Sequence, residues 1–247
     1  MKVIKPFEYA FVTERPLDAL DLASKEVPRI SIVGAGGKTT TLEALADDYR
    51  ERKRLAIVTT TTHMFYPEDR WFFTTSEDVS YIQYKLKEHG IVWVGAPCDH
   101  GKITSVSEEF KQELLKCKIP ILVEADGSKR LPFKIPNDRE PVLFPGTTCV
   151  LALLGMDALH KQIGEVCFRG EMVARFLSKT GDDILEEDDF VKIIMSSQGS
   201  RKQVNSSMQF KVILNKVDTE ETMKYALNIR NKLMEQRNED VYITSYQ

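Results

Sequence analysis

A three-layer α/β fold, with a mainly parallel central sheet and helices on both faces, is what this sequence predicts, and three observations support it. Apolar runs with the residue types of buried strands alternate with amphipathic stretches at helical spacing. This βαβα order is typical of parallel sheets that are covered on both faces. A glycine-rich turn joins the first central strand to a helix, and the composition, 42% hydrophobic and 29% charged, is ordinary for a soluble domain.

The length of 247 residues fits one large domain, which we place at residues 29–247, preceded by a leader at residues 1–28 with a short helix near 17–24. The net charge of −3 gives no reason to expect nucleic acid or an anionic membrane as a partner. No long apolar run indicates a membrane span, and the first residues lack the apolar core of a signal peptide. We therefore expect a cytoplasmic protein without membrane or nucleic-acid partners.

Residues 29–46 predict a buried strand, a glycine turn and an amphipathic helix in direct succession. Glycines without a Cβ allow backbone N–H groups to approach an anion, and the N-terminus of the helix directs further amides to the same point. In this arrangement Lys38 reaches the β- and γ-phosphates of a nucleotide as a catalytic group, and the Thr39 hydroxyl binds Mg²⁺. The predicted nucleotide-binding residues of the turn and the helix start are Gly34, Ala35, Gly36, Gly37, Lys38, Thr39 and Thr40.

The turn is shorter than the usual phosphate-binding loop, because two residues instead of four separate Gly34 from Gly37. A similar short loop followed by threonines occurs in the Mur-type peptide ligases, so its length is compatible with nucleotide binding. The order of strand, glycines, Lys-Thr and helix predicts a P-loop NTPase-like fold. The alternative is a glycine-rich turn that binds no ligand.

Two carboxylates end a later strand. After predicted strands at 54–65, 71–74 and 91–97 and helices at 77–89 and 105–117, the strand 119–124 leads into Glu124 and Asp126, whose side chains point to the same side if the alternation continues. An acid at a strand tip beside a phosphate loop commonly holds Mg²⁺, so we assign Asp126 to metal binding and catalysis and Glu124 to the metal site. The alternative is a solvated acidic strand end.

A basic cluster of Lys129, Arg130 and Lys134 follows these carboxylates. Its cations face the γ-phosphate or an anionic substrate, or they are only solvated. Together with the proline-rich residues after it, the cluster forms a segment at 127–147 that is long enough to act as a lid. Beyond it we expect a central strand at 149–159 and helices at 165–178 and 186–198.

The segment 211–218 predicts an apolar strand that ends in Asn215-Lys216-Val217-Asp218, the N-K-x-D sequence with which GTP-binding proteins recognise guanine. The Asp218 carboxylate accepts from N1–H and the exocyclic amine of guanine, and adenine lacks that pair of donors. Asn215 contacts the acceptor edge of the base, and the stem of Lys216 covers its face. The alternative is that Asp218 only caps the next helix, predicted at 219–236.

Several segments together resemble the YqeC family of selenium-dependent hydroxylase accessory proteins: IVGAGGKTTT, the threonine run before His63, LVEADGSKRLPFK, the corner at 155–158 and VILNKVD. The resemblance spans about residues 30–218. It implies a role in the maturation of selenium-dependent molybdenum hydroxylases, with such a hydroxylase as the client, through a P-loop nucleotide site. The chain departs from the family pattern at 168–171, where it has Phe-Arg-Gly-Glu instead of His-Arg-Pro-Glu.

Three functions fit these features. The first is an Mg-dependent NTPase, with GTP favoured over ATP, in which Lys38, Thr39 and Asp126 organise the nucleotide and hydrolysis drives cofactor insertion. The second is a nucleotide-gated binding chaperone, in which GTP orders the 127–147 segment so that a client docks. A third, an ATP-dependent ligase of the Mur type, predicts that ATP outcompetes GTP.

Overall fold

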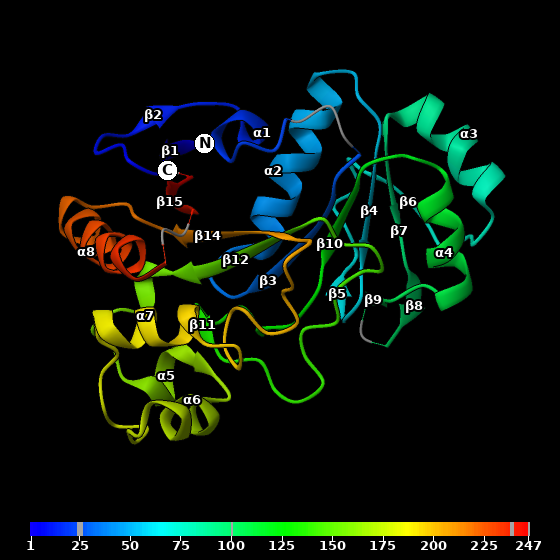
Figure 1. Ribbon diagram of the computed structural model, residues 1–247. Coiled ribbons are helices and arrows are strands. Elements are labelled where there is room, and N and C mark those ends of the chain that lie inside the picture. Colours follow the sequence, from blue (N-terminus) through cyan, green and yellow to red (C-terminus); the bar gives the residue numbers. More distant parts are fainter. Residues whose placement is uncertain (24–26, 100, 238–239, 247) are drawn as a thin grey trace.

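The computed structural model describes residues 1–23, 27–99, 101–237 and 240–246, and it contains a ten-stranded sheet between layers of helices (Figure 1). The strand order is β2-β1-β15-β14-β12-β3-β10-β4-β7-β6. All pairs from β15 to β6 are parallel, and β1 and β2 form an antiparallel edge. The strands are β1 (Lys2–Ile4), β2 (Val12–Thr13), β3 (Arg29–Gly34), β4 (Ala56–Thr60), β6 (Phe72–Thr74), β7 (Ile91–Val94), β10 (Ile121–Glu124), β12 (Cys149–Gly155), β14 (Gln209–Asn215) and β15 (Asp240–Ser245). The predicted three-layer α/β fold is confirmed.

The helices divide between the two faces of the sheet because strand side chains alternate. On β10, for example, Leu122 packs in the cluster under α2, whereas Ile121 and Val123 pack in the cluster under α3 and α4. One face carries α1 (Pro16–Ala19) and α2 (Lys38–Glu51). The other carries α3 (Val79–His89), α4 (Glu108–Lys116), α7 (Glu187–Met195) and α8 (Glu220–Arg237).

Short elements near the carboxyl edge of the sheet were not predicted. A three-stranded sheet consists of β5 (Met64–Phe65), β9 (Lys102–Thr104) and β8 (Ala96–Cys98), and a two-stranded one of β11 (Phe133–Lys134) and β13 (Cys167–Phe168). The predicted strand 54–65 therefore divides into β4 and β5. The predicted helix 165–178 divides into α5 (Ile163–Val166) and α6 (Gly170–Leu177), because β13 pairs with β11 between them, and η1 (Met156–Ala158) follows β12.

Two predicted segments are packed into this fold. The leader 1–28 contributes β1 and β2 to the same sheet as residues 29–247, with Val3, Ile4 and Leu17 fully buried. Its helix is α1, and residue 24 of the predicted helix lies outside the described residues. Within the segment 127–147, Phe133 and Phe144 are buried, and of its residues only 127–131 and Glu140 line the large cavity described below. Over the described ranges, no helix combines the length and hydrophobicity needed to cross a bilayer, and the cytoplasmic location stays a prediction.

Candidate functional site

The glycine turn, residues 34–37, runs between the end of β3 and the start of α2, with both neighbouring strands close against it. Gly34, Gly36 and Gly37 have φ angles of 90°, 84° and 125°, in the region that side chains disfavour. A Cβ on Gly36 would lie 2.3 Å from the backbone nitrogen of Gly155, and one on Gly34 would lie 2.2 Å from the carbonyl oxygen of Leu153. Among the described residues, no side chain caps the N-terminus of α2, so its first-turn amides remain for an anion.

Lys38 is the first residue of α2, and its side chain lies back across the turn. Its Nζ donates to the carbonyl oxygen of Gly34 (2.7 Å) and to Ser128 Oγ (3.2 Å), and it lies 3.3 Å from Asp126 Oδ1. The side chain is 4% exposed and lines the cavity. The ammonium group therefore stands beside the turn amides, where the charge of a phosphate group would be neutralised.

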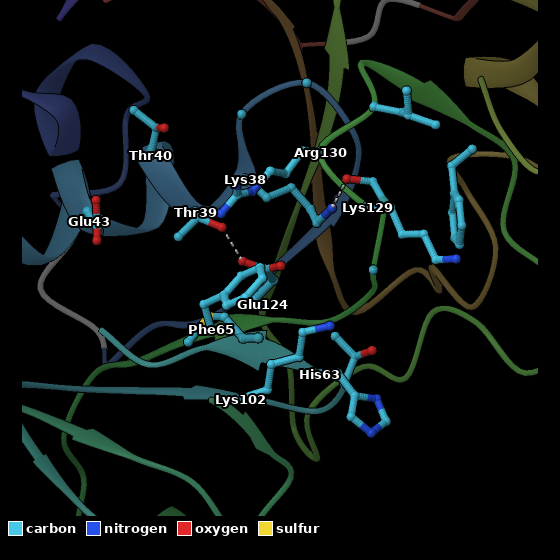
Figure 2. A pocket seen from close by; sticks show the side chains of 18 of the residues that line it. Lys38, Thr39, Thr40, Glu43, His63, Phe65, Lys102, Glu124, Lys129 and Arg130 are labelled. Atoms are coloured by element: carbon cyan, nitrogen blue, oxygen red, sulfur yellow. Dashed lines mark hydrogen bonds between the residues drawn. The ribbon is translucent and has the colours of Figure 1, made fainter. Parts of the chain in front are cut away.

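Thr39 and Glu124 meet inside the cavity. Thr39 Oγ1 donates to Glu124 Oε2 (2.8 Å), as the dashed line in Figure 2 shows. Burial raises the pKa of Glu124 above its ordinary value of 4.5, against the lowering effects of Lys38 and the Thr39 hydroxyl. A hydroxyl and one carboxylate beside a phosphate site fit Mg²⁺, which takes few protein ligands and fills its octahedron with water and phosphate oxygens. In the parts of the chain that are described, no group of three or more His, Cys, Asp or Glu residues forms a metal cage.

Asp126 lies beneath the turn instead of in the cavity. Because β10 ends at Glu124, the strand alternation does not continue to Asp126. Its Oδ2 accepts from the Gly34 amide (2.9 Å) and lies 3.0 Å from Lys134 Nζ, and the side chain is 2% exposed. Asp126 therefore fixes the backbone of the turn and the position of Lys38, and it does not line the cavity.

A chain of alternating charges continues from Asp126 toward α6. Lys134 Nζ, 1% exposed, also contacts Glu140 Oε2 (2.9 Å), and Arg169 donates to both Glu140 oxygens (2.7 and 3.2 Å). Burial raises the pKa of Glu140, but hydrogen bonds from Arg169 and Lys134 outweigh it and hold that pKa below its ordinary value of 4.5. Lys134, which was predicted to face a phosphate or substrate, instead forms ion pairs within this internal network.

The cavity beside the turn has a volume of about 690 Å³ and is lined from both sides of β3. It reaches from Lys216, after β14, to Lys102 on β9. Figure 2 shows Thr39 and Glu124 with Phe65, Lys102 and Lys129 around them. Its wall also includes Trp93, whose indole N–H has no hydrogen-bond partner among the described residues. The sequence analysis did not predict Phe65, Lys102 and Phe168 as site residues, because they lie on strands of two or three residues, which are too short to show a periodic pattern.

The N-K-x-D residues lie on the other side of the turn. Asn215 Nδ2 donates to the Gly36 carbonyl oxygen (2.8 Å), and Asn215 Oδ1 accepts from Thr244 Oγ1 (2.8 Å). Asp218 is exposed, accepts from Ser245 Oγ (2.6 Å) and does not line the cavity. The structure thus brings Asn215 against the glycine turn and leaves the Asp218 carboxylate at the surface.

Lys216 follows Asn215 with a φ of 63°, and its Nζ lies 2.7 Å from Asp157 Oδ2. Of the threonine run at 59–62, Thr62 lines the cavity together with Thr39 and Thr40. Thr60 Oγ1 instead donates to the Glu124 carbonyl oxygen (2.9 Å), which holds the two strand ends together.

Comparisons with known proteins give one family and two similar proteins. The family described as YqeC protein matches residues 30–171, which include the glycine turn and both carboxylates but not the N-K-x-D sequence. An uncharacterized protein YqeC of Escherichia coli (strain K12) is 32% identical over 192 residues, 75% of each chain. Among solved structures, HypB from Helicobacter pylori in complex with nickel is 14% identical with a TM-score of 0.36, over 94% of this chain and 84% of that chain.

Proposed function

Since the chain belongs to the YqeC family, we propose that it is an Mg-dependent P-loop nucleotide-binding accessory protein that hydrolyses GTP during the maturation of molybdenum hydroxylases. The observation that carries the proposal is the convergence of the uncapped α2 amides, Lys38 Nζ and the Thr39–Glu124 pair at one end of the cavity. Positive groups and a metal-binding pair at one point suit the triphosphate of a nucleotide.

Each group has a distinct task in this proposal. The turn amides and Lys38 bind the β- and γ-phosphates, and Thr39 and Glu124 would hold Mg²⁺, which neutralises charge on the phosphate oxygens. Asp126 is a positioning residue, because it holds the Gly34 amide and Lys38 in place. We identify no side chain that would activate the attacking water, so we expect slow turnover without a client protein.

The guanine preference rests on the residues after β14. Asn215 supports the glycine turn from behind, and the exposed Asp218 carboxylate, oriented by Ser245, is accessible to the donors of a guanine base. Lys216, which lines the cavity, lies between Asn215 and Asp218 in the sequence, and its ion pair with Asp157 holds its ammonium group. A base bound here places the triphosphate across the turn.

A second candidate function is a nucleotide-gated chaperone with little catalysis. Residues 127–131 line the cavity directly after β10, whereas Lys134 anchors the following part of the predicted lid. The part that responds to nucleotide in this proposal is therefore 127–131, not all of 127–147. Stimulation of phosphate release by a client hydroxylase favours this function over an enzyme that modifies a small substrate.

Equilibrium titration of the full chain with non-hydrolysable GTP and ATP analogues, with Mg²⁺ present, tests the proposal. Lys38→Ala should weaken both analogues at least about 100-fold, because it removes a buried charge-assisted contact. Asp218→Asn should weaken only the GTP analogue, by about 10–100-fold, and Lys87→Gln, exposed on α3 and outside the cavity, should change neither. Equal binding by wild type and Lys38→Ala would contradict the proposal, and a preference for ATP would favour the ligase alternative.

A further inference from the structure

We infer that the cavity holds a second ligand site beside the triphosphate, for a small molecule with an oxyanion group such as a phosphate ester or a carboxylate. The groups that bind it are Lys102, Lys129 and Arg130, which we call the cation cluster. The inference rests on the proposed function, because the position of the triphosphate decides which part of the cavity is left for another ligand.

The order of the strands separates the two sites. The proposed base-recognition residues follow β14, which is separated from β3 by β12, whereas β5 follows β4, which is separated from β3 by β10 on the opposite side. Asp218 does not line the cavity, but Phe65 and Lys102 do. A nucleotide bound with its base at Asp218 therefore has its base on the β14 side of the glycine turn and its phosphates at the turn itself. The part between β5, β9 and residues 127–131 remains open, next to the terminal phosphate.

The cation cluster differs from the other cations of the cavity in its partners. Lys38, Arg169 and Lys216 each pair with a carboxylate. Lys102, Lys129 and Arg130 have no carboxylate partner within the described part of the chain, and they contact aromatic faces instead. Lys102 Nζ and Arg130 Cζ lie 5.1 and 4.9 Å from the ring centroid of Phe65, and Lys129 Nζ lies 5.6 Å from that of Phe168.

The backbone after Ser128 turns sharply at the residues that line this part of the cavity. Lys129 and Arg130 have φ angles of 47° and 65°, two consecutive left-handed residues that are not glycine. A hydrogen bond from the Leu131 amide to the Ser128 carbonyl oxygen (2.9 Å) closes this turn. Residues keep such conformations where the surrounding structure requires them, often at ligand sites. Ser128 itself accepts from Lys38, so the turn is connected to the proposed phosphate site.

The ligand class follows from charge and size. Two ammonium groups and a guanidinium without carboxylates recognise an oxyanion, and the planar fork of arginine binds phosphate or carboxylate with two parallel hydrogen bonds. The total volume of about 690 Å³ lies within the range of small-molecule sites. With a triphosphate at the turn, the remainder accommodates a small molecule and not a folded protein segment. Its position beside the terminal phosphate is that of a second substrate.

Calorimetric titration tests the inference on the full chain saturated with Mg²⁺ and a non-hydrolysable GTP analogue. The probes are phenyl phosphate and benzoate, which share a ring and differ in the oxyanion. We expect one or both to bind together with the analogue. The double variant Lys102→Gln, Arg130→Gln should lower the probe affinity at least ten-fold and change the analogue affinity less than two-fold. The control Lys87→Gln removes one exposed charge outside the cavity and should leave the probe affinity unchanged.

Binding of phenyl phosphate alone would assign the site to phosphate esters, and binding of benzoate alone to carboxylates. The inference is overturned if neither probe binds, if the double variant binds them like wild type, or if the nucleotide analogue displaces them, since they would then occupy the glycine turn. If the analogue itself fails to bind, the proposed function falls and the inference with it. If the analogue binds and the probes do not, only the inference falls.

Discussion

The β14 side and the β5 side of the glycine turn differ in whether their polar groups already have partners. On the β14 side, Asn215 joins the glycine turn to β15, and Asp218 and Lys216 have their own partners in Ser245 and Asp157. On the β5 side, the cation cluster contacts aromatic rings and pairs with no carboxylate among the described residues. The polar groups on the β14 side are therefore already satisfied within the protein, whereas the cations on the β5 side keep their charge available for a ligand.

The two sides should also differ in how substitutions affect the free energy of unfolding of the empty protein. A buried polar group that loses its partner costs free energy whether or not a ligand is bound. An exposed cation contributes little to folding and gains value only when an anion approaches it. Substitution of the buried Asn215 on the β14 side should therefore lower the stability of the empty protein, and substitutions in the cation cluster should not.

The largest effect is expected at Lys134, which is buried between Asp126 and Glu140. Lys134→Met removes the cation between Asp126 and Glu140 and should lower the free energy of unfolding by about 3–5 kcal/mol at neutral pH, because it leaves buried carboxylates poorly compensated. Urea denaturation measures this, with Lys232→Met on the exposed face of α8 as the control expected to cost much less. Equal losses for the two variants would show that the internal charge chain does not support the site.

The same variant has a predictable pH dependence. Because the pKa of folded Glu140 lies below 4.5, its ionised form stabilises the wild type fully above pH 4.5, and this contribution is lost as the pH falls through the folded pKa. The difference between wild type and Lys134→Met should therefore shrink below about pH 4.5. A difference that grows on acidification would contradict the assigned network.

Gly36→Ala should cost at least about 3 kcal/mol, because the new Cβ would meet backbone atoms of Gly155 at 2.3 and 2.4 Å in a left-handed conformation. Gly90→Ala has a similar φ of 76° but nothing within 4 Å, so it isolates the conformational cost of about 1–2 kcal/mol. Thermal unfolding of the pair checks the prediction. Similar losses for both would mean that the turn is not held against β12.

Asn215→Ala should lower stability by about 1–3 kcal/mol in the absence of nucleotide, because the Gly36 carbonyl oxygen and the Thr244 hydroxyl lose a buried partner. It should weaken GTP and ATP analogues alike through the displaced turn. The matched variant Asp218→Asn, at an exposed position, should leave stability within about 0.5 kcal/mol and change only base preference. An equal loss of stability in both variants would contradict the assignment of Asn215 to holding the glycine turn and of Asp218 to base preference.

Glu124→Gln should raise the stability of the empty protein at neutral pH. The raised pKa of folded Glu124 means that its ionised form opposes folding, increasingly as the pH rises from 4.5 through the folded pKa, and the amide removes this cost. The variant should also weaken Mg²⁺ binding in the nucleotide complex at least about ten-fold. Unchanged Mg²⁺ affinity would place the metal elsewhere.

The smallest effect belongs to the cation cluster. Lys102→Gln should change the free energy of unfolding of the empty protein by less than about 0.5 kcal/mol, because the lysine forms no ion pair with any residue that the structure describes. Chemical denaturation of the wild type and the variant, each with and without phenyl phosphate, measures this. The stability without ligand should be the same in both proteins, and the increase on adding phenyl phosphate should be smaller in the variant. A large loss without ligand would mean that Lys102 has a structural role.

Local patterns predicted much of the fold and less of the site. The strands of the parallel sheet and the glycine turn follow from short-range periodicity and glycine spacing, which is why Lys38, Thr39 and Glu124 come together as the spacing suggested. The position of Asp126 depends on register: Glu124 pairs with Ile32, and this brings Asp126 level with the Gly34 amide. Register between strands almost a hundred residues apart has no local signal.

The site residues on the β5 side also depend on strand pairing that has no local signal in the sequence. Phe65 and Lys102 belong to two neighbouring strands of which one is two residues long, and Phe168 reaches the cavity because β13 pairs with β11. Strands of two or three residues span hardly more than one alternation period, which is too short for a prediction. The basic residues 129 and 130 were visible in the sequence, but their left-handed backbone was not.

The cavity wall contains a spectroscopic reporter. Trp93 lines the cavity, its ring centroid lies 5.8 Å from that of Trp71, and these are the only tryptophans in the chain. Emission excited at the indole band therefore originates entirely from this corner of the molecule. A change in its intensity or wavelength would follow the filling of the site in real time, without a label.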